Sequence, residues 1–390
     1  MSEVLFTATN ENLETGLRGY PVGYCNSSFA DPQLGLHYVG RPVSQMGSWR
    51  PEEVIYLLLN KTKGSKAEVA EFSRELAVMG TCSPELVASI EALPRKGHPM
   101  KLLSAALLLL GVDRLGMDEE SDYRRDALNV IAKMPHLVAT VINHHAGWGK
   151  TWTPDPELGY MENFTAMVNV PDKNDELLLK TFSLFNILHY DHGGGNLSAF
   201  VGKAVASGME DMYGSLAASM CALAGPRHGK ANQDCLEFVR DVLKEVGNHP
   251  KAGDVGKLIR QRLDSKQLVY GFGHAVLRVE DPRASLFYDF AEANFSDDPL
   301  VRIARALRTE GVFELKKEAK IANPYPNIDA ISGTVLAASG FDYPEYFTVL
   351  FGLARAIGIA IQIIYERCEA RGGKGTPIVR PRYIYSGPKP

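Results

Sequence analysis

The sequence predicts a mostly α-helical protein with a short extended segment at its N-terminus. Helix start and stop signals recur from Ser48 to about residue 370, whereas the alternating pattern typical of strands is nearly absent after residue 47. Residues 1–47 are instead rich in Gly, Pro, Tyr and Val, a composition typical of short strands or extended loops. We therefore expect many packed helices and not an α/β sheet.

Each helix of the first half is marked by its own start or stop residues. Pro51 suits the first turn of a helix that continues through EEVIYLLLN, and Ser65 with Glu68 forms a capping box ahead of VAEFSRELAVMG. Ser83 starts the next helix, and Gly111 is expected to end the apolar helix KLLSAALLLLG. Further helices are expected at 122–133, 136–145 and 173–191, with a loop rich in Pro and Gly at about 147–159.

The second half continues the helical pattern to a long apolar segment. Helices are expected at 200–207, 211–223, 229–246, 253–264, 283–295, 298–309, 327–339 and 344–370. The last includes VLFGLARAIGIAIQIIY, which is about long enough to cross a membrane but carries Arg355 near its middle. We interpret it as a buried core helix, so Arg355 needs a carboxylate from the protein or from a ligand. The basic, extended tail PIVRPRYIYSGPKP is typical of a segment that lies across another subunit.

Length and composition narrow the class of protein. The 390 residues allow two or three domains or one large one, and the apolar fraction of 45% allows a substantial core. Lys+Arg 42 against Asp+Glu 46 gives a net charge of −4, which argues against general nucleic-acid binding and against an anionic membrane surface. The five cysteines are scattered and never spaced as CxxC, and the first residues lack a signal or transit pattern. We therefore expect reduced thiols and a cytoplasmic protein.

Three titratable residues stand in segments framed by Gly or Pro. They are His228 in GPRHGKAN, His274 in YGFGHAVLRVEDPRA and Asp329 in NPYPNIDAISG. Two imidazoles and a carboxylate form a natural acid/base set. Each has a structural alternative: His228 as a helix cap or loop contact, His274 in a surface turn, and Asp329 as an ordinary capping residue.

The surroundings of the two histidines favour a carbonyl substrate with negative charge. A helix start disfavours a protonated imidazole, so a neutral His228 there can donate a hydrogen bond to an oxygen that becomes negative. Arg278 and Arg283 follow His274 closely, which indicates an anionic ligand such as a carboxylate or phosphate. The nucleotide patterns GxGxxG and GxxxxGK are absent from the sequence.

The segment HYDHGGGN offers a further pair of histidines. His189 and His192 stand at a helical spacing, but they lack a Glu, Asp or Cys companion in a ligand pattern such as HExxH, so we expect no metal. His192 and Asn196 beside three glycines fit a loop that contacts substrate. Signatures of covalent nucleophilic catalysis, such as GxSxG, are also missing.

Taken together, five segments resemble citrate synthases, and their wording is similar to the eukaryotic-type branch. In chain order they are HYDHGGGNLSA, LAGPRHGKANQ, YGFGHAVLRVEDPR, NPYPNIDAISG and FTVLFGLARAIG. The resemblance is nearly continuous over 160–383 and looser before it. It implies a multi-helical fold with a large domain (1–226 and 341–390), a small domain (227–340) and a working homodimer.

The resemblance also implies a reaction and roles for the three titratable residues. Asp329 would take a proton from the methyl group of acetyl-CoA, and His228 would stabilise the resulting enol or enolate. His274 would polarise the oxaloacetate ketone and protonate the new alkoxide, after which citryl-CoA is hydrolysed to citrate. No metal or redox cofactor is implied, because the coenzyme A thioester is itself a substrate.

Substrate-binding residues follow from the same resemblance. It implies that His192, Arg283 and Arg355 bind oxaloacetate and that Asn196 orients His228. Arg380, in the tail, would complete the site of the partner subunit. The residues implied to contact coenzyme A are Arg18, Arg278 and Lys320, with the backbone of 268–273 near its adenine.

Some positions depart from the eukaryotic-type motifs, and three alternatives stay open. Ile331 and Tyr270 replace a histidine and a proline, Ala322 replaces a lysine, and SAFVGK (198–203) replaces a His-containing stretch. A 2-methylcitrate synthase would use propionyl-CoA, and one methylene changes discrimination by only about 1–3 kcal/mol. The enzyme could also work in reverse, by cleaving citrate. A non-catalytic assembly protein is the third alternative, against which the intact His228, His274 and Asp329 argue.

Overall fold

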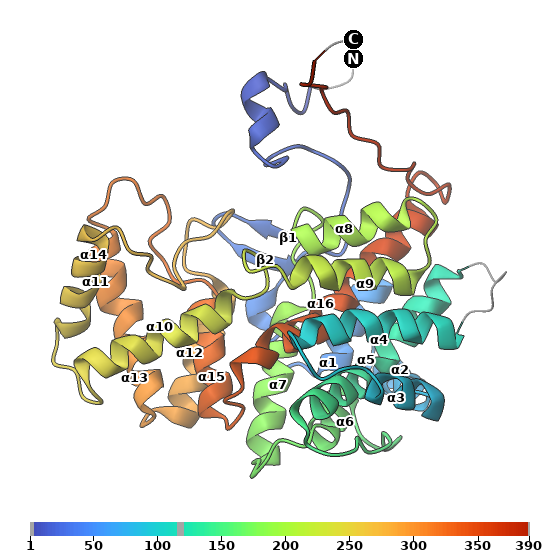
Figure 1. The fold of residues 1–390 in the computed structure, drawn as a ribbon, viewed down its shortest axis with the longest axis horizontal. Helices are drawn as coiled ribbons and strands as arrows, with labels where there is room; N and C mark the ends of the chain where they lie inside the picture. Colours follow the sequence, from blue (N-terminus) through green and yellow to red (C-terminus); the bar gives the residue numbers. More distant parts are fainter. Residues whose placement is uncertain (1–3, 115–120, 389–390) are drawn as a thin grey trace.

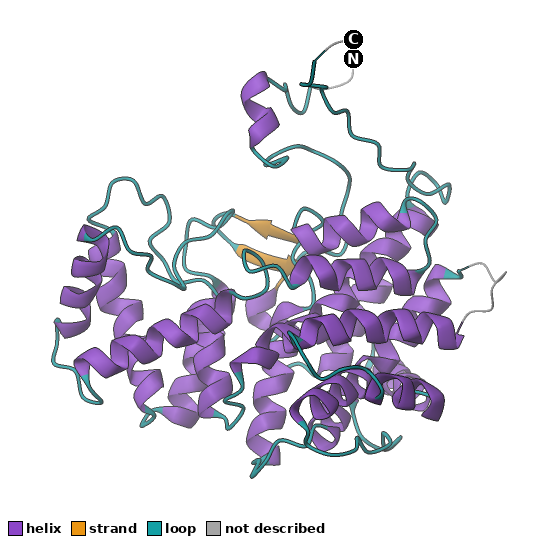
Figure 2. Ribbon diagram, in the orientation of Figure 1, coloured by secondary structure: helices purple, strands orange, loops and turns teal. Residues whose placement is uncertain are grey.

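The computed structural model describes residues 4–114 and 121–388, and helices dominate it (Figure 2). A small antiparallel sheet in the order β1 (Ser28–Asp31), β2 (Gly35–Tyr38), β3 (Arg41–Pro42) lies within the N-terminal segment. Its register pairs Phe29 with His37 and His37 with Pro42. The prediction of a mostly α protein with a short extended N-terminal segment is confirmed.

The first helices of the chain lie together in one part of the molecule (Figure 1). They are α1 (Pro51–Asn60), α2 (Lys66–Met79), α3 (Pro84–Glu91), α4 (Pro99–Arg114), α5 (Tyr123–Ala146), α6 (Tyr160–Met167), α7 (Asp175–His189), α8 (Leu197–Ala206) and α9 (Met212–Leu223). Ser65 and Ser83 cap α2 and α3 as the sequence predicts, each accepting a backbone N–H of the first turn.

The later helices extend the molecule and then return to it. They are α10 (Ala231–Val246), α11 (Asp254–Asp264), α12 (Pro282–Phe295), α13 (Pro299–Ala306), α14 (Val312–Leu315), α15 (Asp329–Ala338) and α16 (Phe347–Ile364). Figure 1 shows α10, α11, α13 and α14 gathered at one end, away from α1–α6. The returning helix α16 packs against α5, α7, α8 and α9.

Buried apolar side chains of the described residues form two clusters. The larger runs from Leu36 to Ile364. The smaller draws on α10, α11 and α13 and includes Phe238, Val255 and Ile303. It falls within the predicted small domain, although α12 and α15 of the same range contribute to the larger cluster. The domain boundaries at 227 and 340 therefore stay a prediction.

The apolar segment near the C-terminus is a core helix. Pro344–Glu369 is long and apolar enough to cross a membrane by length and composition, with a hydropathy of 2.0, but 94% of that window is buried inside the protein. Such burial is typical of the central helix of a folded core. The interpretation of this segment as a buried core helix, made from Arg355 in its middle, is confirmed.

Two predicted helix boundaries are wrong because distant residues compensate for local breakers. Tyr123–Ala146 forms the single helix α5, although Pro135 lies inside it. Pro135 has no N–H for the carbonyl oxygen of Ile131, and the Tyr160 hydroxyl donates to that oxygen instead (2.9 Å). Gly111 does not end α4, which continues to Arg114, because its missing side chain makes room for Tyr213 of α9.

Other elements differ from the sequence prediction in extent. Helix α6 was not predicted, and the helix predicted at 298–309 continues through the short π-helical turn Leu307–Gly311 into α14. α8 begins at Leu197, three residues before its predicted start, because Asn196 caps it by accepting the Ala199 N–H (3.1 Å). α10 begins at Ala231 and not at 229.

Gly358 lets α16 lie directly against the segment that carries His192. A Cβ atom at Gly358 would lie 2.8 Å from the Cβ atom of Asp191 and still closer to the carbonyl oxygen of Tyr190. One turn further on, the Gln362 side chain donates to Asp191 Oδ1 (2.6 Å). The surface of α16 therefore sets the position of the segment before α8.

Gly358→Ala is expected to lower the free energy of unfolding by about 2 kcal/mol, although alanine is the better helix former. The added methyl group would press on backbone, which cannot move aside cheaply. Denaturant unfolding measures the loss. Gly352→Ala on the same helix is the control, because its Cβ would meet the movable ends of side chains (Leu103, Met220 and Met100) and no backbone. We expect a change below about 0.5 kcal/mol. Equal losses at both glycines would contradict this explanation.

Candidate active site

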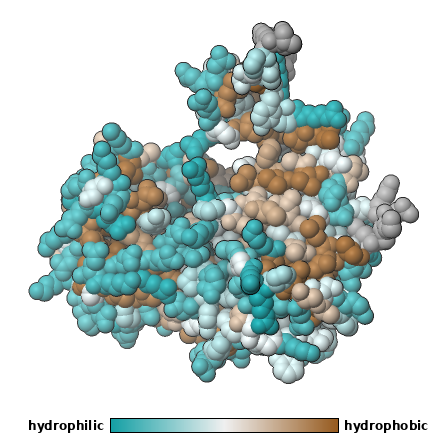
Figure 3. Space-filling view, in the orientation of Figure 1, coloured by the Kyte–Doolittle hydropathy of each residue, from teal (hydrophilic) through white to brown (hydrophobic). Residues whose placement is uncertain are grey.

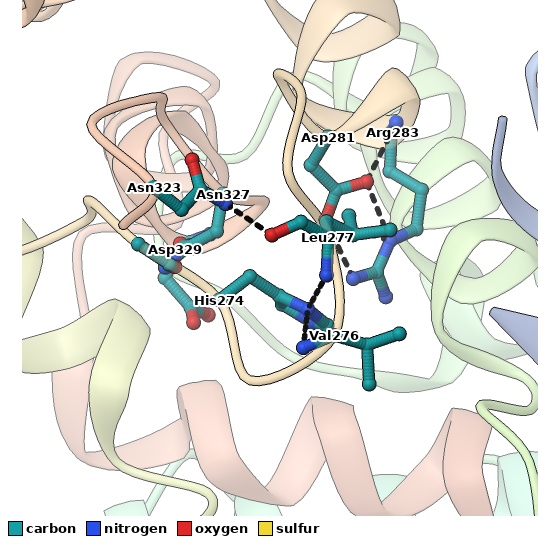
Figure 4. Close-up of polar contacts among 9 residues, drawn as sticks. His274, Val276, Leu277, Asp281, Arg283, Asn323, Asn327 and Asp329 are labelled. Carbon is teal, nitrogen blue, oxygen red and sulfur yellow. Dashed lines mark hydrogen bonds and ion pairs between the residues drawn. The ribbon is translucent and has the colours of Figure 1, made fainter. Parts of the chain in front are cut away.

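His274 lies in the loop before α12, and backbone groups fix its tautomer (Figure 4). Its Nδ1 atom accepts the N–H groups of Val276 and Leu277, both at 3.0 Å. A ring nitrogen that accepts two N–H groups carries no proton, so the proton of the neutral ring is on Nε2. Burial first, and the charge of Arg283 second, lower the pKa of His274. The residue therefore presents a neutral Nε2–H donor.

Asp329 is the first residue of α15 and follows the loop NPYPN. Its backbone N–H donates to Asn327 Oδ1 (2.9 Å), and no hydrogen bond to its carboxylate is found among residues 4–114 and 121–388. Burial raises the pKa of Asp329 to about 6, against the opposing charge of Arg283. Figure 4 shows its carboxylate on the same side of the two loops as the His274 ring. A carboxylate with a raised pKa is a good general base near neutral pH.

His228 lies in the turn between α9 and α10, three residues before α10 begins. The prediction that it stands at the helix start is therefore wrong, and burial accounts for its neutrality better than the helix dipole does. Burial, followed by the charge of Arg355, lowers the pKa of His228 to about 4. Its Nε2 atom accepts the Ser198 N–H (3.3 Å) and lies 2.9 Å from Ser198 Oγ, so the ring proton is on Nδ1.

Asn196 is linked to His228 through Ser198, a residue that was not predicted from the sequence. The Ser198 hydroxyl donates to Asn196 Oδ1 (3.0 Å), and the Asn196 side-chain amide donates to the carbonyl oxygen of Gly193 (2.7 Å). Ser198 thus connects Asn196 to the His228 ring. The signal that could have identified it is a serine in the first turn behind an Asn cap.

Arg283 is buried, at 3% exposed, and already holds an internal partner. Its Nε and Nη2 atoms donate to the Asp281 carboxylate at 3.0 and 2.7 Å, and Asp281 also caps α12. Burial alone would raise the pKa of Asp281, but the Arg283 guanidinium holds it below its ordinary value. Asp281 was not predicted, although an Asp-Pro-Arg start of a helix could have indicated it.

Arg355 is equally buried, at 2% exposed, but differs in having no ion pair among the described residues. Its Nε atom donates to the carbonyl oxygen of His189 (3.0 Å), and its guanidinium lies over the Phe351 ring, 4.7 Å from the centroid. Burial lowers the pKa of Arg355 to about 10. The described residues thus do not supply the carboxylate partner that the sequence predicts for Arg355. We therefore expect an anionic ligand to supply it.

His192 places a second imidazole beside that of His274. Its ring centroid lies 5.3 Å from that of His274. Burial first, then Arg283 and Arg355, lower the pKa of His192 well below its ordinary value, so it is neutral. Two buried guanidiniums and two neutral imidazole donors suit a small ligand with two carboxylates and a carbonyl group.

His189 is a structural residue. It is buried, its Nδ1 atom lies 2.7 Å from the carbonyl oxygen of Phe185, and burial lowers its pKa to about 3. Within residues 4–114 and 121–388, no group of three or more His, Cys, Asp and Glu side chains is placed to hold a metal ion. The expected absence of a metal stays a prediction.

The remaining predicted binding residues are not gathered at this pocket. The side chains of Arg18 and Lys320 are exposed and make no hydrogen bond or ion pair found among the described residues. Arg380 is exposed in the tail, which leaves the body beside the N-terminal segment (Figure 1). Arg278 folds back on its own loop, where Nη1 donates to the carbonyl oxygens of Val276 (3.0 Å) and Leu277 (2.8 Å).

A surface pocket leads to His228 from outside. Its volume is about 620 Å³, and it is lined by Asn196, Leu197, Gly225, Pro226, Arg227 and His228. Such a volume is in the range of pockets that bind small molecules.

Solved structures share this fold. Citrate synthase from Pyrobaculum aerophilum matches with a TM-score of 0.82 and 28% identity, covering 96% of this chain and 92% of that one. Citrate synthase from Thermotoga maritima matches with a TM-score of 0.79 and 26% identity, covering 96% of both chains.

Curated relatives correct the predicted location. A mitochondrial citrate synthase of Citrus maxima is 33% identical over 389 residues, covering 95% of this chain and 81% of the relative. A peroxisomal citrate synthase of Saccharomyces cerevisiae is 31% identical over 394 residues, covering 95% and 84%. These names point to organelles, so the prediction of a cytoplasmic protein is wrong. Reduced thiols exclude an oxidising compartment but do not separate the cytosol from an organelle that also keeps thiols reduced.

The family model described as "Citrate synthase, C-terminal domain" matches residues 16–382, nearly the whole chain. The resemblance found in the five sequence segments is thereby confirmed, and with it the assignment as a transferase. The chain belongs to the citrate synthase family.

Proposed function

We propose that this protein condenses acetyl-CoA with oxaloacetate and water to give citrate and coenzyme A. The observation that carries the proposal is the buried Arg355, which has no ion pair among the described residues and whose charge acts on both Asp329, with a pKa of about 6, and His228, with a pKa of about 4. A related structure from Thermoplasma acidophilum, 24% identical with a TM-score of 0.82, was solved with carboxymethyl coenzyme A and oxaloacetate.

The first step is the removal of a proton from the methyl group of acetyl-CoA. Asp329 takes that proton, because its carboxylate is ionised at neutral pH and makes no hydrogen bond within the described residues that would hold it away from substrate. His228 donates its Nδ1–H to the thioester oxygen, where the negative charge of the enolate develops. The backbone N–H of Ser198 donates to Nε2, on the opposite edge of that ring.

The second step joins the enol carbon to the oxaloacetate ketone. Arg283 and Arg355 bind the two carboxylates, and His192 adds a further contact. His274 donates Nε2–H to the ketone oxygen and transfers that proton as the alkoxide forms. The two backbone N–H groups on Nδ1 stabilise the negative charge left on the ring. Hydrolysis of citryl-CoA then releases citrate and coenzyme A.

A homodimer is part of the proposal. The tail exposes Ile378, Val379, Tyr383, Ile384 and Tyr385, and the N-terminal segment exposes Leu13 and Val22. Figure 3 shows apolar side chains on this projecting lobe and on the body beneath it. Exposed apolar surface of this extent is typical of an interface. A second subunit would cover it and place Arg380 at the partner's site, whereas sedimentation as a monomer at assay concentrations would contradict this arrangement.

The test is the release of thiol from acetyl-CoA with and without oxaloacetate, run beside propionyl-CoA. Release that depends on oxaloacetate, with acetyl-CoA ahead in kcat/KM, supports the proposal. A higher kcat/KM for propionyl-CoA would make the protein a 2-methylcitrate synthase instead. A folded protein that binds oxaloacetate but releases no thiol would be a non-catalytic member of the family.

The pH dependence should follow Asp329. Its pKa of about 6 lies above the ordinary value, so the base is increasingly protonated below pH 6, whereas His228, with a pKa of about 4, stays neutral there. We expect kcat/KM for acetyl-CoA to fall about tenfold per pH unit below about pH 6. Initial rates between pH 5 and 8 measure this, and a flat profile down to pH 5 would exclude Asp329 as the base.

A further inference from the structure

The loop that carries His274 and the loop that precedes Asp329 are bonded to each other through their backbones. The Gly273 N–H donates to the carbonyl oxygen of Tyr325 (3.0 Å), and the Asn327 N–H donates to the carbonyl oxygen of Gly271 (2.9 Å). His274, the proposed acid, and Asp329, the proposed base, are therefore carried by two loops that are hydrogen-bonded to each other.

One side chain connects the two catalytic positions directly. The Asn327 amide donates from Nδ2 to the carbonyl oxygen of Gly273 (2.9 Å), the residue before His274. Its Oδ1 atom accepts the backbone N–H of Asp329 (2.9 Å). A single planar amide thus spans from the backbone next to the acid to the backbone of the base.

Asparagine suits this place on chemical grounds. An amide offers a donor and an acceptor at once, whereas an ionised carboxylate of the same shape can only accept. It is also neutral, so it adds no charge beside Asp329. The short side chain allows Oδ1 to bond the N–H two residues on, which fixes the turn from which Asp329 starts α15.

Asn323, four residues earlier, makes the same pair of bonds elsewhere. Its Nδ2 atom donates to the carbonyl oxygen of Leu277 (2.7 Å), and its Oδ1 atom accepts the Tyr325 N–H (3.0 Å). It too crosslinks the loops, but its side chain hydrogen-bonds neither to Asp329 nor to the residue before His274. Substitutions of the two asparagines can therefore be compared. One removes a bond between the loops away from the reacting groups, and the other removes the bond beside His274 and Asp329.

We propose that Asn327 is a positioning residue that sets the carboxylate of Asp329 against the Nε2–H of His274. The inference rests on the proposed function. Proton abstraction from a weak carbon acid needs the base within a few tenths of an ångström of its working position, and a misplacement of about 1 Å can cost about 10²-fold in rate. Asn327 supplies this accuracy because it bonds both loops next to the two groups.

The first test compares Asn327→Ala with Asn323→Ala as the matched control. We expect Asn327→Ala to lower kcat about 30-fold, with the oxaloacetate dissociation constant within about threefold, because Arg355 and His192 lie on other elements. Asn323→Ala should lose similar thermal stability but less than about threefold in kcat. Unfolding, oxaloacetate binding and thiol release are measured on all three proteins.

A second readout separates positioning from loss of structure. A misplaced base makes proton transfer slower, so the kinetic isotope effect with methyl-deuterated acetyl-CoA should rise in Asn327→Ala and stay unchanged in Asn323→Ala. Asn327→Asp has the same shape and keeps the acceptor for the Asp329 N–H but loses the donor to Gly273. It should also lower kcat and raise the isotope effect, even if the alanine variant folds poorly.

The outcomes are distinguishable. Near-normal kcat in Asn327→Asp, or equal losses in the two alanine variants with an unchanged isotope effect, would overturn the positioning role while the proposed function stands. If the unaltered protein releases no thiol with oxaloacetate, the proposed function itself fails, and this inference fails with it.

Discussion

Asp329→Asn is expected to lower kcat about 10³-fold, the usual scale for removal of a general base, while the oxaloacetate dissociation constant stays within about threefold. The amide has nearly the same shape but cannot accept the methyl proton of acetyl-CoA. The oxaloacetate ligands Arg355 and His192 are not changed by this substitution. Thiol release and calorimetric binding of oxaloacetate measure the two effects. Activity within tenfold of the unaltered protein would refute the assignment of Asp329 as the base.

The same substitution has a consequence for stability, whose sign follows from the raised pKa. Burial raises the pKa of Asp329 from 3.8 to about 6, so its ionisation at pH 7 costs folding free energy, up to about 3 kcal/mol. Asp329→Asn removes that cost, and the variant should be at least as stable at pH 7. The difference should shrink as the pH falls through 6 toward 4, and it should vanish below 3.8, where the carboxyl is neutral in both states. Urea unfolding at pH 7 and pH 4 provides the control that lost activity is not lost folding.

Arg355→Met is expected to weaken oxaloacetate binding by about 100-fold or more, equivalent to about 3 kcal/mol. The guanidinium is buried with no carboxylate partner among the described residues, so a bound carboxylate would be its counter-charge. Methionine fills a similar volume without charge. Calorimetry with oxaloacetate alone, without the acyl substrate, isolates this effect from catalysis.

Arg283→Met is the informative comparison because the two arginines differ in the free protein. Arg355→Met should leave the free energy of unfolding within about 1 kcal/mol, since the lost bond to the His189 carbonyl offsets the removed cost of an unpaired buried charge. Arg283→Met would strand the buried Asp281 carboxylate and should cost about 3–5 kcal/mol. Similar stability losses in the two variants would contradict the electrostatic distinction drawn here.

The sequence indicated the candidate residues of the site but not the groups that hold them in place. Glycines and prolines mark the loops of His228, His274 and Asp329, since those backbones need unusual geometry, and such residues are visible in a sequence. Arg283 and Arg355 look alike in sequence, and only folding shows that Asp281 neutralises one of them. Ser198 was missed for a similar reason, because its role depends on a ring thirty positions away in the chain.

The predicted helix boundaries were wrong where a distant group made the hydrogen bond that a local group could not make. The break expected at Pro135 did not occur, because the Tyr160 hydroxyl satisfies the Ile131 carbonyl oxygen that proline leaves free. No local pattern contains that bond. Arg380, Arg18 and Lys320 lie outside the pocket of their own chain, because their predicted partners are a second subunit and coenzyme A. Their roles stay predictions that assembly and ligand binding will decide.

The backbone hydrogen bonds to His274 affect which substitutions this site can accept during evolution. Both donors to Nδ1 are main-chain N–H groups of residues 276 and 277, which every amino acid except proline supplies. Position 276 can therefore carry other side chains, proline excepted, without a change in the protonation state of His274. A lineage can in this way alter the side chain at position 276 while the proton donor is inherited unchanged.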